Sequence, residues 1–469
     1  MNESSKESNG SNVDDFVIGI IGMGDMGKMY ANNFYKAGWN CIVCDRPENF
    51  DSLNDFYKDT PVDVVRNGHF VSRKADFIIY SVEAEFIDRV VAEYGASTKV
   101  GAIVSGQTSV KAPERVAFEK HLPDDVYVVS VHSLHGPTVS PEGQPLVLIQ
   151  HKSPEWVLRK TEEVFACFRS RYVYLTYEEH DIVTANTQAV THAAFLSMGT
   201  AWNMSQSYPW ELDRYVNGIE VVKCNIALRI YANKWHVYAG LAILNPSAHA
   251  QVRQFAASAT DLFKLMIAGD YEGLKERALD GRRKVFGYKD GVEPGTNGEK
   301  SERTPILLSE SLLDRFSLHQ PSSQHCSARN SHLTILAMVD CWNKLGIHPF
   351  DHLDVAGTPL FRMWIGVAEY LFRSPERLNI ALESATHDLS HRSDDTEFVV
   401  ATRGWSEVIE HGSFNHYKAK FETTAKFLEP RFEEAARMNK EMLKVIMESG
   451  APKTVKTPPK EPVSLPLLK

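Results

Sequence analysis

Three glycines at the end of the first apolar run constrain the fold more than any other feature of this chain. Gly22, Gly24 and Gly27 follow residues 16–21 (FVIGII) and open the amphipathic segment MGKMYANNFYKAG. In a strand-turn-helix unit, the first glycine permits a tight turn, the second lets a pyrophosphate approach the backbone, and the third lets the helix pack against the strand. The helix N-terminus then faces the anion. The sequence therefore predicts a dinucleotide site formed by Gly22, Met23, Gly24, Asp25, Met26 and Gly27.

Short apolar runs alternate with amphipathic segments as far as residue 176. The runs are FVIGII (16–21), CIVC (41–44), FIIYSV (77–82), VGAIV (100–104), VYVVSV (126–131), LVLIQ (146–150) and YVYLT (172–176). Strands that alternate with helices predict βαβ units, and hence an α/β fold with an N-terminal Rossmann-type, mainly parallel sheet. Cys41 and Cys44 lie three apart in one such strand, so their side chains face opposite sides and neither a redox pair nor a metal site is expected there.

From Glu178 onward the strand-like runs give way to helical apolar spacing, which predicts an all-helical domain, possibly duplicated. We expect a disordered head at 1–14, a dinucleotide-binding Rossmann domain at 15–177, a helical substrate or dimerisation-type domain at 178–287, a linker or insertion at 288–320, a second helical region at 321–449 and a disordered tail at 450–469.

The two helical regions resemble each other when aligned with a shift of 140 residues. Thr191-His192 then pairs with Ser331-His332, Trp202 with Trp342, and Pro209-Trp210 with Pro349-Phe350. A slightly larger shift pairs AGDYEGLK (268–275) with EHGSFNHYK (410–418). The pattern indicates either a degenerate duplication or a chance match of similar helical compositions. In a duplication the second copy has lost chemistry, because Glu369 aligns with Arg229.

Charge and hydropathy exclude two classes of partner. The chain has 51 Lys and Arg against 60 Asp and Glu, a formal charge of −9, and no basic cluster of the kind that nucleic-acid binding requires. No apolar run approaches the roughly 18 residues of a membrane span, and the first residues are polar rather than basic and then apolar. We therefore expect a cytoplasmic protein.

The residues that would choose between NAD and NADP follow the second predicted strand. Asp45 and Arg46 lie about 20 residues beyond the glycines, where an acidic residue binds the ribose hydroxyls of NAD and an arginine accepts the additional phosphate of NADP. The chain carries both residue types, so these positions leave the cofactor open. Ser81 and Val82, at the end of the third run, are further candidates for cofactor binding.

Ser109 and His132 follow or end predicted strands, where ligands of open α/β sheets gather. The alternative is that Ser109 caps the next helix and His132 is a satisfied turn residue.

Three further polar residues lie in the predicted helices. Gln188 and His192 are four apart and so share one helix face, as a polar contact or as part of a site. Arg229 interrupts the apolar helix NIALRIYA, so it pairs either with an internal carboxylate or with one on a substrate.

Taken in order, these segments resemble the prephenate dehydrogenase family. The resemblance rests on GMGDMG, on SVK at 109–111, on HSLHGP at 132–137, on HDIVTANTQAVTH at 180–192, and on Arg229-Ile230-Tyr231-Ala232 followed by Tyr238. It covers about residues 16–287, and the long C-terminal continuation is most similar to the fungal members, which use NADP. Gly106 stands where the family often has an acidic residue, and Ser133 replaces a proline.

The resemblance implies an oxidoreductase acting on a CH-CH group, which converts prephenate to 4-hydroxyphenylpyruvate by oxidative decarboxylation in tyrosine biosynthesis. The hydride passes to NADP, with NAD not excluded, and no metal is implied. His132 would polarise the ring hydroxyl, Ser109 would orient it, and Arg229 would bind a substrate carboxylate. Gln188, His192 and Tyr238 would line the substrate pocket. Relatives commonly dimerise through their helical domains, so we expect a homodimer or a pseudo-dimeric monomer.

Three alternatives remain. Arogenate differs from prephenate only in an amino-bearing side chain. Related 3-hydroxy-acid dehydrogenases resemble one another in a GxxxKxxxN-type segment with a catalytic lysine, where this chain has NTQAVTH. An NADP-sensing binding protein without turnover would have no need of His132, Ser109 and Arg229 together.

Overall fold

The computed structural model describes residues 15–212, 218–288, 313 and 330–437, and it divides into two compact units. The N-terminal unit comprises residues 1–180 with 461–469, and the helical unit comprises residues 181–460. Our predictions for the head at 1–14, the tail at 450–469 and nearly all of the linker at 288–320 lie outside the described residues.

The N-terminal unit contains one eight-stranded sheet with the order β3-β2-β1-β4-β5-β6-β7-β8. All neighbouring strands are parallel except β6 and β7. The strands are β1 (Val17–Ile21), β2 (Asn40–Cys44), β3 (Asp63–Val64), β4 (Phe77–Tyr80), β5 (Ile103–Gly106), β6 (Tyr127–Ser133), β7 (Pro145–His151) and β8 (Arg171–Tyr174). The predicted mainly parallel sheet is confirmed. The sequence missed β3, because two residues carry no readable periodicity.

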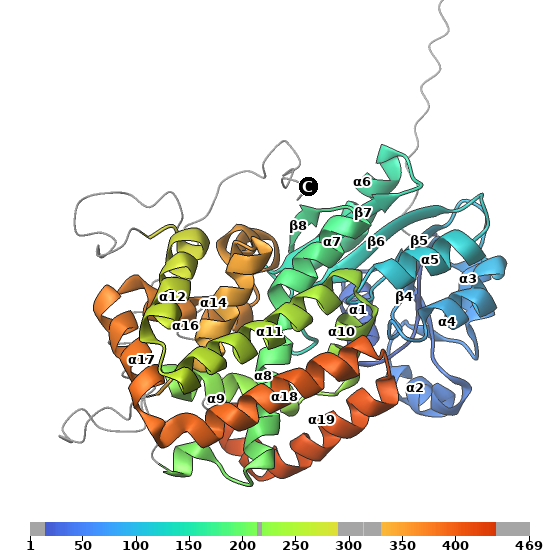
Figure 1. Cartoon of the computed structure of the whole chain (residues 1–469). Helices are drawn as coiled ribbons and strands as arrows, with labels where there is room; N and C mark the ends of the chain where they lie inside the picture. The colour runs from blue at the N-terminus through green and yellow to red at the C-terminus, as the bar shows by residue number, and fades with distance from the viewer. Residues whose placement is uncertain (1–14, 213–217, 289–312, 314–329, 438–469) are drawn as a thin grey trace, which may run out of the picture. The chain divides into compact units, whose positions relative to one another are not determined.

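Helices cover both faces of this sheet (Figure 1). Side chains of α1, α2 and α6 share one core with Ile18 and Ile20, whereas α3, α4 and α5 share another with Ile21. Cys41 belongs to the first core and Cys44 to the second, which confirms their predicted opposite directions. The helices are α1 (Asp25–Lys36), α2 (Phe50–Tyr57), α3 (Gly68–Lys74), α4 (Ile87–Tyr94), α5 (Ala112–His121), α6 (Glu155–Phe165) and α7 (Tyr177–Thr184), of which α7 runs into the helical unit.

The strand order reverses between β1 and β4, which are adjacent although β2 and β3 lie between them in the chain. Connections from the carboxyl ends of these two strands leave the sheet in opposite directions and open a crevice for ligands. The glycine loop follows β1, and Ser81 follows β4, so the predicted cofactor residues lie at this switch point.

The helical unit has one hydrophobic core to which both helical regions contribute. Phe195 of the first region packs against Trp364 of the second with ring centroids 4.9 Å apart, and the indole N–H of Trp405 donates to the hydroxyl of Thr200. None of the described helices is long and apolar enough to cross a membrane. The helices are α8 (Val190–Met204), α9 (Gly218–Tyr231), α10 (His236–Leu244), α11 (Pro246–Ala268), α12 (Tyr271–Phe286), α14 (Leu333–Leu345), α15 (Leu353–Ala356), α16 (Pro359–Arg373), α17 (Pro375–His387), α18 (Arg392–Glu410) and α19 (Phe414–Leu428).

Candidate functional site

Each glycine of the loop between β1 and α1 has its own steric environment. Gly22 adopts a φ of +100°, and a Cβ there would lie 2.3 Å from the carbonyl oxygen of Ser81 and 2.9 Å from Val82. A Cβ on Gly27 would lie 2.1 Å from the carbonyl oxygen of Gly22. A Cβ on Gly24 would meet no atom within 4 Å. Since the protein itself leaves room for a side chain at position 24, the open backbone there fits a pyrophosphate at the start of α1.

Asp45, after β2, holds this glycine loop. Its Oδ2 accepts a hydrogen bond from the backbone N–H of Met23 at 2.7 Å, and its Oδ1 accepts one from the backbone N–H of Arg46 at 2.6 Å and one from Asn49 at 3.1 Å. The side chain of Arg46 is 73% exposed, with its Nε 3.6 Å from a carboxylate oxygen of Glu48. An exposed guanidinium at the end of β2 suits the 2′-phosphate of NADP.

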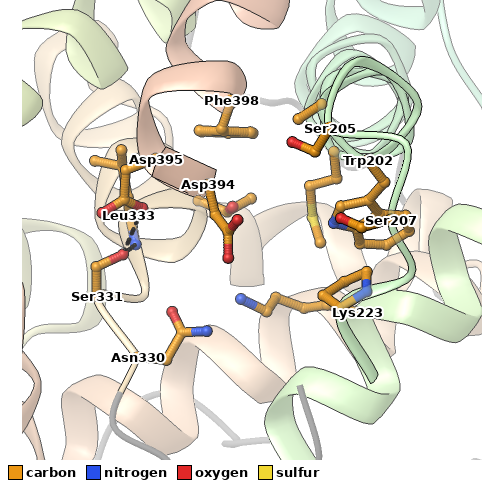
Figure 2. A pocket seen from close by; sticks show the side chains of 14 residues that line it. Trp202, Ser205, Ser207, Lys223, Asn330, Ser331, Leu333, Asp394, Asp395 and Phe398 are labelled. Carbon is orange, nitrogen blue, oxygen red and sulfur yellow. Dashed lines mark hydrogen bonds between the residues drawn. The ribbon is translucent and has the colours of Figure 1, made fainter. Parts of the chain in front are cut away.

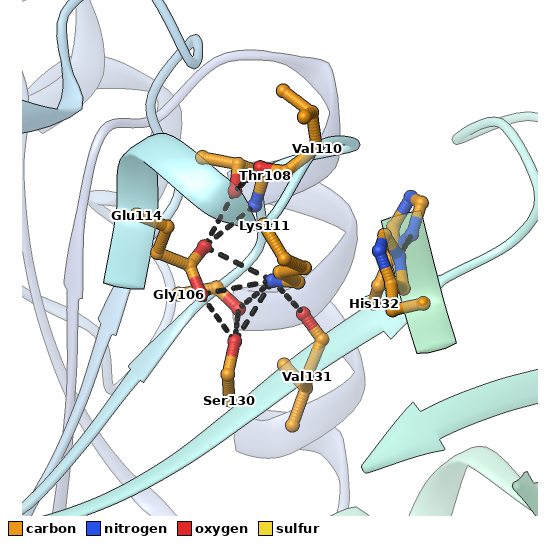
Figure 3. A network of polar contacts seen from close by, with 9 residues as sticks. Gly106, Thr108, Val110, Lys111, Glu114, Ser130, Val131 and His132 are labelled. Atoms are coloured by element: carbon orange, nitrogen blue, oxygen red, sulfur yellow. Dashed lines mark hydrogen bonds and ion pairs between the residues drawn. The ribbon is translucent and has the colours of Figure 1, made fainter. Parts of the chain in front are cut away.

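The ammonium group of Lys111 is buried among oxygen atoms at the carboxyl end of the sheet (Figure 3). Its Nζ lies 3.0 Å from both carboxylate oxygens of Glu114 and 2.8 Å from the hydroxyl of Ser130. The carbonyl oxygens of Gly106 and Val131 lie at 3.0 and 2.9 Å. A buried charge is tolerated only when it is paired and hydrogen-bonded, so these contacts hold β5, β6 and the start of α5 together.

The carboxylate of Glu114 occupies the space beside Gly106, where an added Cβ would lie 2.2 Å from it. The acidic group that the family often carries at position 106 is therefore supplied here from α5. The N-cap of α5 is Lys111, and no side chain caps this helix. The interpretation of Ser109 as a helix cap is wrong, because α5 begins beyond the reach of its hydroxyl group.

His132 lies within β6 rather than in a turn, and it forms a buried pair with His180 of α7. Nδ1 of His132 and Nε2 of His180 are 2.7 Å apart. Burial lowers the pKa of His132 well below its usual range, and the nearby His180 and Lys111 lower it further. Burial likewise lowers the pKa of His180. Both rings are therefore neutral near pH 7, and one proton joins the two facing nitrogens. The following residue, Ser133, bonds through its hydroxyl to that of Tyr30 at 2.7 Å.

Arg229, near the end of α9, has no carboxylate partner among the described residues. Burial lowers the pKa of its guanidinium. Asn233 donates through Nδ2 to the carbonyl oxygen of Arg229 at 3.1 Å and to the hydroxyl of Tyr238 at 2.9 Å. Of the two interpretations of Arg229, the part of the chain that is described supports the one in which its partner carboxylate comes from a ligand.

His192 and Tyr238 are in contact, with ring centroids 4.7 Å apart and an interplanar angle of 72°. Burial lowers the pKa of His192 to about 3, so this ring is neutral. Gln188 lies in a π-helical turn, Ala185–Ala189, which separates α7 from α8. The prediction that Gln188 and His192 share a face assumed regular α-helical spacing, which this turn interrupts. The structure therefore joins His192, Tyr238, Asn233 and Arg229, and gives Gln188 no established place among them.

A pocket elsewhere in the helical unit, at the ends of α8, α9, α14 and α18, encloses about 500 Å³ including space open to solvent (Figure 2). None of the predicted site residues lines it. Lys223, Asp394 and Asp395 contribute charged groups, and burial raises the pKa of Asp395 to about 7. Because it holds charges of both signs, it is distinct in chemistry as well as in residues from the region of Arg229.

The sequence analysis did not identify Glu114, Ser130, His180 or Asn233 as residues of a site. Glu114 carried a readable signal, since it lies three residues after Lys111 in a predicted helix and so shares its side. His180 lay within a segment that resembles the family, but its pairing with His132 spans 48 residues of sequence. Only the folded sheet brings those two rings together.

Comparisons with known proteins identify the family. Residues 189–448 match a family described as a 6-phosphogluconate dehydrogenase C-terminal domain, and residues 17–105 match the one described as NADP oxidoreductase coenzyme F420-dependent. The chain is 51% identical over 443 residues to the prephenate dehydrogenase [NADP(+)] of Saccharomyces cerevisiae, across 93% of this chain and 95% of that protein. The chain belongs to the NADP-dependent prephenate dehydrogenase family.

Two further relatives show how far this family membership extends along the chain. The probable prephenate dehydrogenase [NADP(+)] of Schizosaccharomyces pombe is 50% identical over 434 residues, 92% of this chain and 98% of that one. The probable arogenate/prephenate dehydrogenase of Methanocaldococcus jannaschii is 24% identical over 264 residues, 55% of this chain and 58% of that one. The predicted likeness to fungal prephenate dehydrogenases is confirmed, and it includes the second helical region.

The steric difference between Gly22 and Gly24 predicts opposite effects of the same substitution. Gly24→Ala should leave the thermal unfolding temperature unchanged and weaken NADP+ binding by about tenfold or more, because the methyl group enters the space left for the ligand. Gly22→Ala should lower the unfolding temperature, because its Cβ meets backbone atoms at a positive φ. Calorimetric titration with NADP+ and a thermal melt of each variant test this. Unchanged NADP+ affinity in Gly24→Ala would contradict the assignment of the loop.

Proposed function

We propose that this chain is an NADP-dependent prephenate dehydrogenase that converts prephenate to 4-hydroxyphenylpyruvate and carbon dioxide. The observation that carries the proposal is the buried, neutral His132 joined to His180 at 2.7 Å, in a chain about half identical to fungal proteins of that name. A neutral imidazole whose one nitrogen is already occupied has a single free nitrogen for a substrate hydroxyl.

The pairing with His180 determines what His132 does. When the shared proton lies on Nδ1 of His132, its Nε2 carries a lone pair and accepts the hydrogen bond of the ring hydroxyl of prephenate. Loss of that proton helps the adjacent carbon to release hydride as the ring carboxylate departs and the ring becomes aromatic. Ser109 orients the hydroxyl group. His180 is then the positioning residue that selects the productive tautomer of His132.

Arg229 binds a carboxylate of the substrate with its planar fork of donors. Tyr238 and Asn233 hold this region in place, and the neutral His192 offers a hydrogen bond without adding charge. Gln188 is a further candidate for contact with the substrate. A cation that has no carboxylate among the described residues of the protein is suited to a dianionic ligand.

NADP+, when bound, supplies the acceptor for the hydride. The backbone from Gly22 to Gly27 and the N-terminus of α1 hold its pyrophosphate, with Ser81 and Val82 beside them. Arg46 binds the 2′-phosphate, whereas Asp45 acts on the cofactor through the loop that it holds. We also propose the cytoplasm as the compartment, which the free thiols of the five described cysteines support.

The proposal predicts prompt formation of NADPH, measured by its absorbance, when the protein is mixed with prephenate and NADP+. His132→Asn should lower kcat by about 10²- to 10⁴-fold with a much smaller change in KM, because the hydrogen-bond acceptor is lost while the binding groups remain. His121→Asn, in the same unit but paired with Asp88, is the matched control. Reduction with arogenate in place of prephenate would favour the first alternative, and no reduction with either would contradict the proposal.

The pH dependence should reveal the lowered pKa of His132. Its neutral form is the active one, so kcat/KM for prephenate should stay level as the pH falls through about 6.5, the ordinary histidine value, and decline only in more acidic solution. His180→Glu should move that decline to higher pH, because a carboxylate beside Nδ1 stabilises the imidazolium. An acid limb centred on pH 6.5 in the unmodified chain would contradict this account.

Arg229→Lys should raise the KM for prephenate by about 10- to 100-fold, since lysine keeps the charge and loses the two-pronged contact. Calorimetric titration should give an unchanged NADP+ affinity, because Arg229 belongs to the helical unit. Arg253→Lys, on the exposed side of α11 in the same unit, serves as the control and should leave both constants unaltered. Equal losses of prephenate and NADP+ affinity in Arg229→Lys would indicate general disruption instead.

A further inference from the structure

The helical unit contains two runs of helices with matching order. The series α8, α9, α10, α11 and α12 is followed by α14, α16, α17, α18 and α19. A short 3-10 helix follows the first member of each series, at Pro209–Leu212 and at Pro349–His352. These two begin 140 residues apart, which is the shift that aligns the two regions in the sequence.

The turns that precede the last helix of each series are built alike. Gly269 and Gly412 both adopt left-handed conformations, with φ of 68° and 67°. The next residue but one begins the helix, and the residue between caps it: Asp270 accepts from the backbone N–H of Gly273, and Ser413 accepts from that of His416. The same local geometry in the same place argues for duplication rather than chance.

Packing between the two series is reciprocal. α11 packs on α14 and α17, and correspondingly α18 packs on α8 and α10. α12 packs on α14, α16 and α17, and correspondingly α19 packs on α8, α9 and α10. The equivalent pairs α11 with α18 and α9 with α16 pack on each other. When contact i to j is matched by contact j to i throughout, the arrangement is that of an isologous dimer, here with the last two helices of each copy placed on the other.

The region of the first copy that contains Arg229 includes an aromatic residue of the second copy. Phe421 of α19 stacks on Tyr238 with ring centroids 6.0 Å apart, and it lies 4.9 Å from the ring of Tyr231. Tyr238 in turn contacts His192. The second copy thus supports the residues that we assign to substrate binding.

The equivalent positions of the second copy are not equipped for the same ligand. Glu369 replaces Arg229, is fully buried, and accepts a hydrogen bond from the hydroxyl of Tyr288 at 2.9 Å. Leu378 stands where Tyr238 would be. His332 corresponds to His192, and its Nδ1 lies 2.9 Å from a carboxylate oxygen of Glu220. A buried acidic group in place of the arginine excludes a dianionic substrate.

We propose that the helical unit is an intertwined dimer fused within one chain, with a single substrate site whose Tyr238 is positioned by Phe421 of the second copy. The inference rests on the proposed function for the identity of the substrate. It implies that the chain completes its site without a second protomer.

The number of sites and the number of chains test this directly. Calorimetric titration of prephenate into the full-length protein with NADPH, which prevents turnover, should give one site per chain, and light scattering should give the mass of one chain at assay concentrations. Glu369→Gln should leave one site per chain. Two sites per chain, or a dimeric mass at low concentration with activity that falls on dilution, would overturn the proposal. Absence of prephenate binding would instead overturn the proposed function, while the mass would still decide the fused dimer.

Phe421→Ala should raise the KM for prephenate by about tenfold, with kcat and NADP+ affinity nearly unchanged, because Tyr238 loses its stacking partner. Phe421→Leu should restore most of the affinity by filling the space. Phe427→Ala is the matched control, since Phe427 lies on the same helix and stacks on Tyr208 at 4.8 Å instead. An unchanged KM in Phe421→Ala, or an equal rise in Phe427→Ala, would overturn the positioning role.

Discussion

The buried ammonium group of Lys111 is the constraint on which the rest of the N-terminal unit's chemistry depends. A charge without water must gather oxygen atoms, and here it collects a carboxylate of α5, a hydroxyl of β6 and two strand-end carbonyls. That requirement fixes the ends of β5 and β6 and explains why position 106 is glycine. The same positive charge helps to keep His132 and His180 neutral. One interaction thereby sets both the position and the protonation of the proposed base.

The helical unit achieves its specificity in a different way. Its single core depends on apolar surfaces exchanged between two copies of one helical arrangement, so neither copy buries its helices alone. Duplication frees one copy from the need to bind a ligand. The first keeps an arginine without a carboxylate among the described residues, and the second carries Glu369 at the same place, closed by Tyr288. Loss of chemistry in the second copy is therefore compatible with a continued structural role.

The distribution of charge between the units matches the reaction. The N-terminal unit presents backbone N–H groups and a neutral imidazole, which suit a pyrophosphate and a hydroxyl proton. The helical unit presents a guanidinium, which suits a carboxylate. Arg46 and Asp45 illustrate how neighbouring residues divide their roles, because the carboxylate is engaged with the glycine loop and the guanidinium is exposed. The NADP(+) in the names of the two fungal relatives agrees with that division.

The sequence by itself determined the features that depend on local spacing. These are the sheet strands, because a period of two is written in consecutive residues, the glycine loop, because each glycine answers a clash within a few residues, and the likeness to a family through five ordered segments. It misjudged Ser109 as a possible cap and assumed regular spacing from Gln188 to His192, because a cap position and a π-turn are decided by packing. Only the tertiary structure decided that His180 faces His132, that Glu114 fills the space beside Gly106, and that Phe421 meets Tyr238. Those contacts join residues far apart in the chain, and no local pattern specifies which distant side chain will fill a given space.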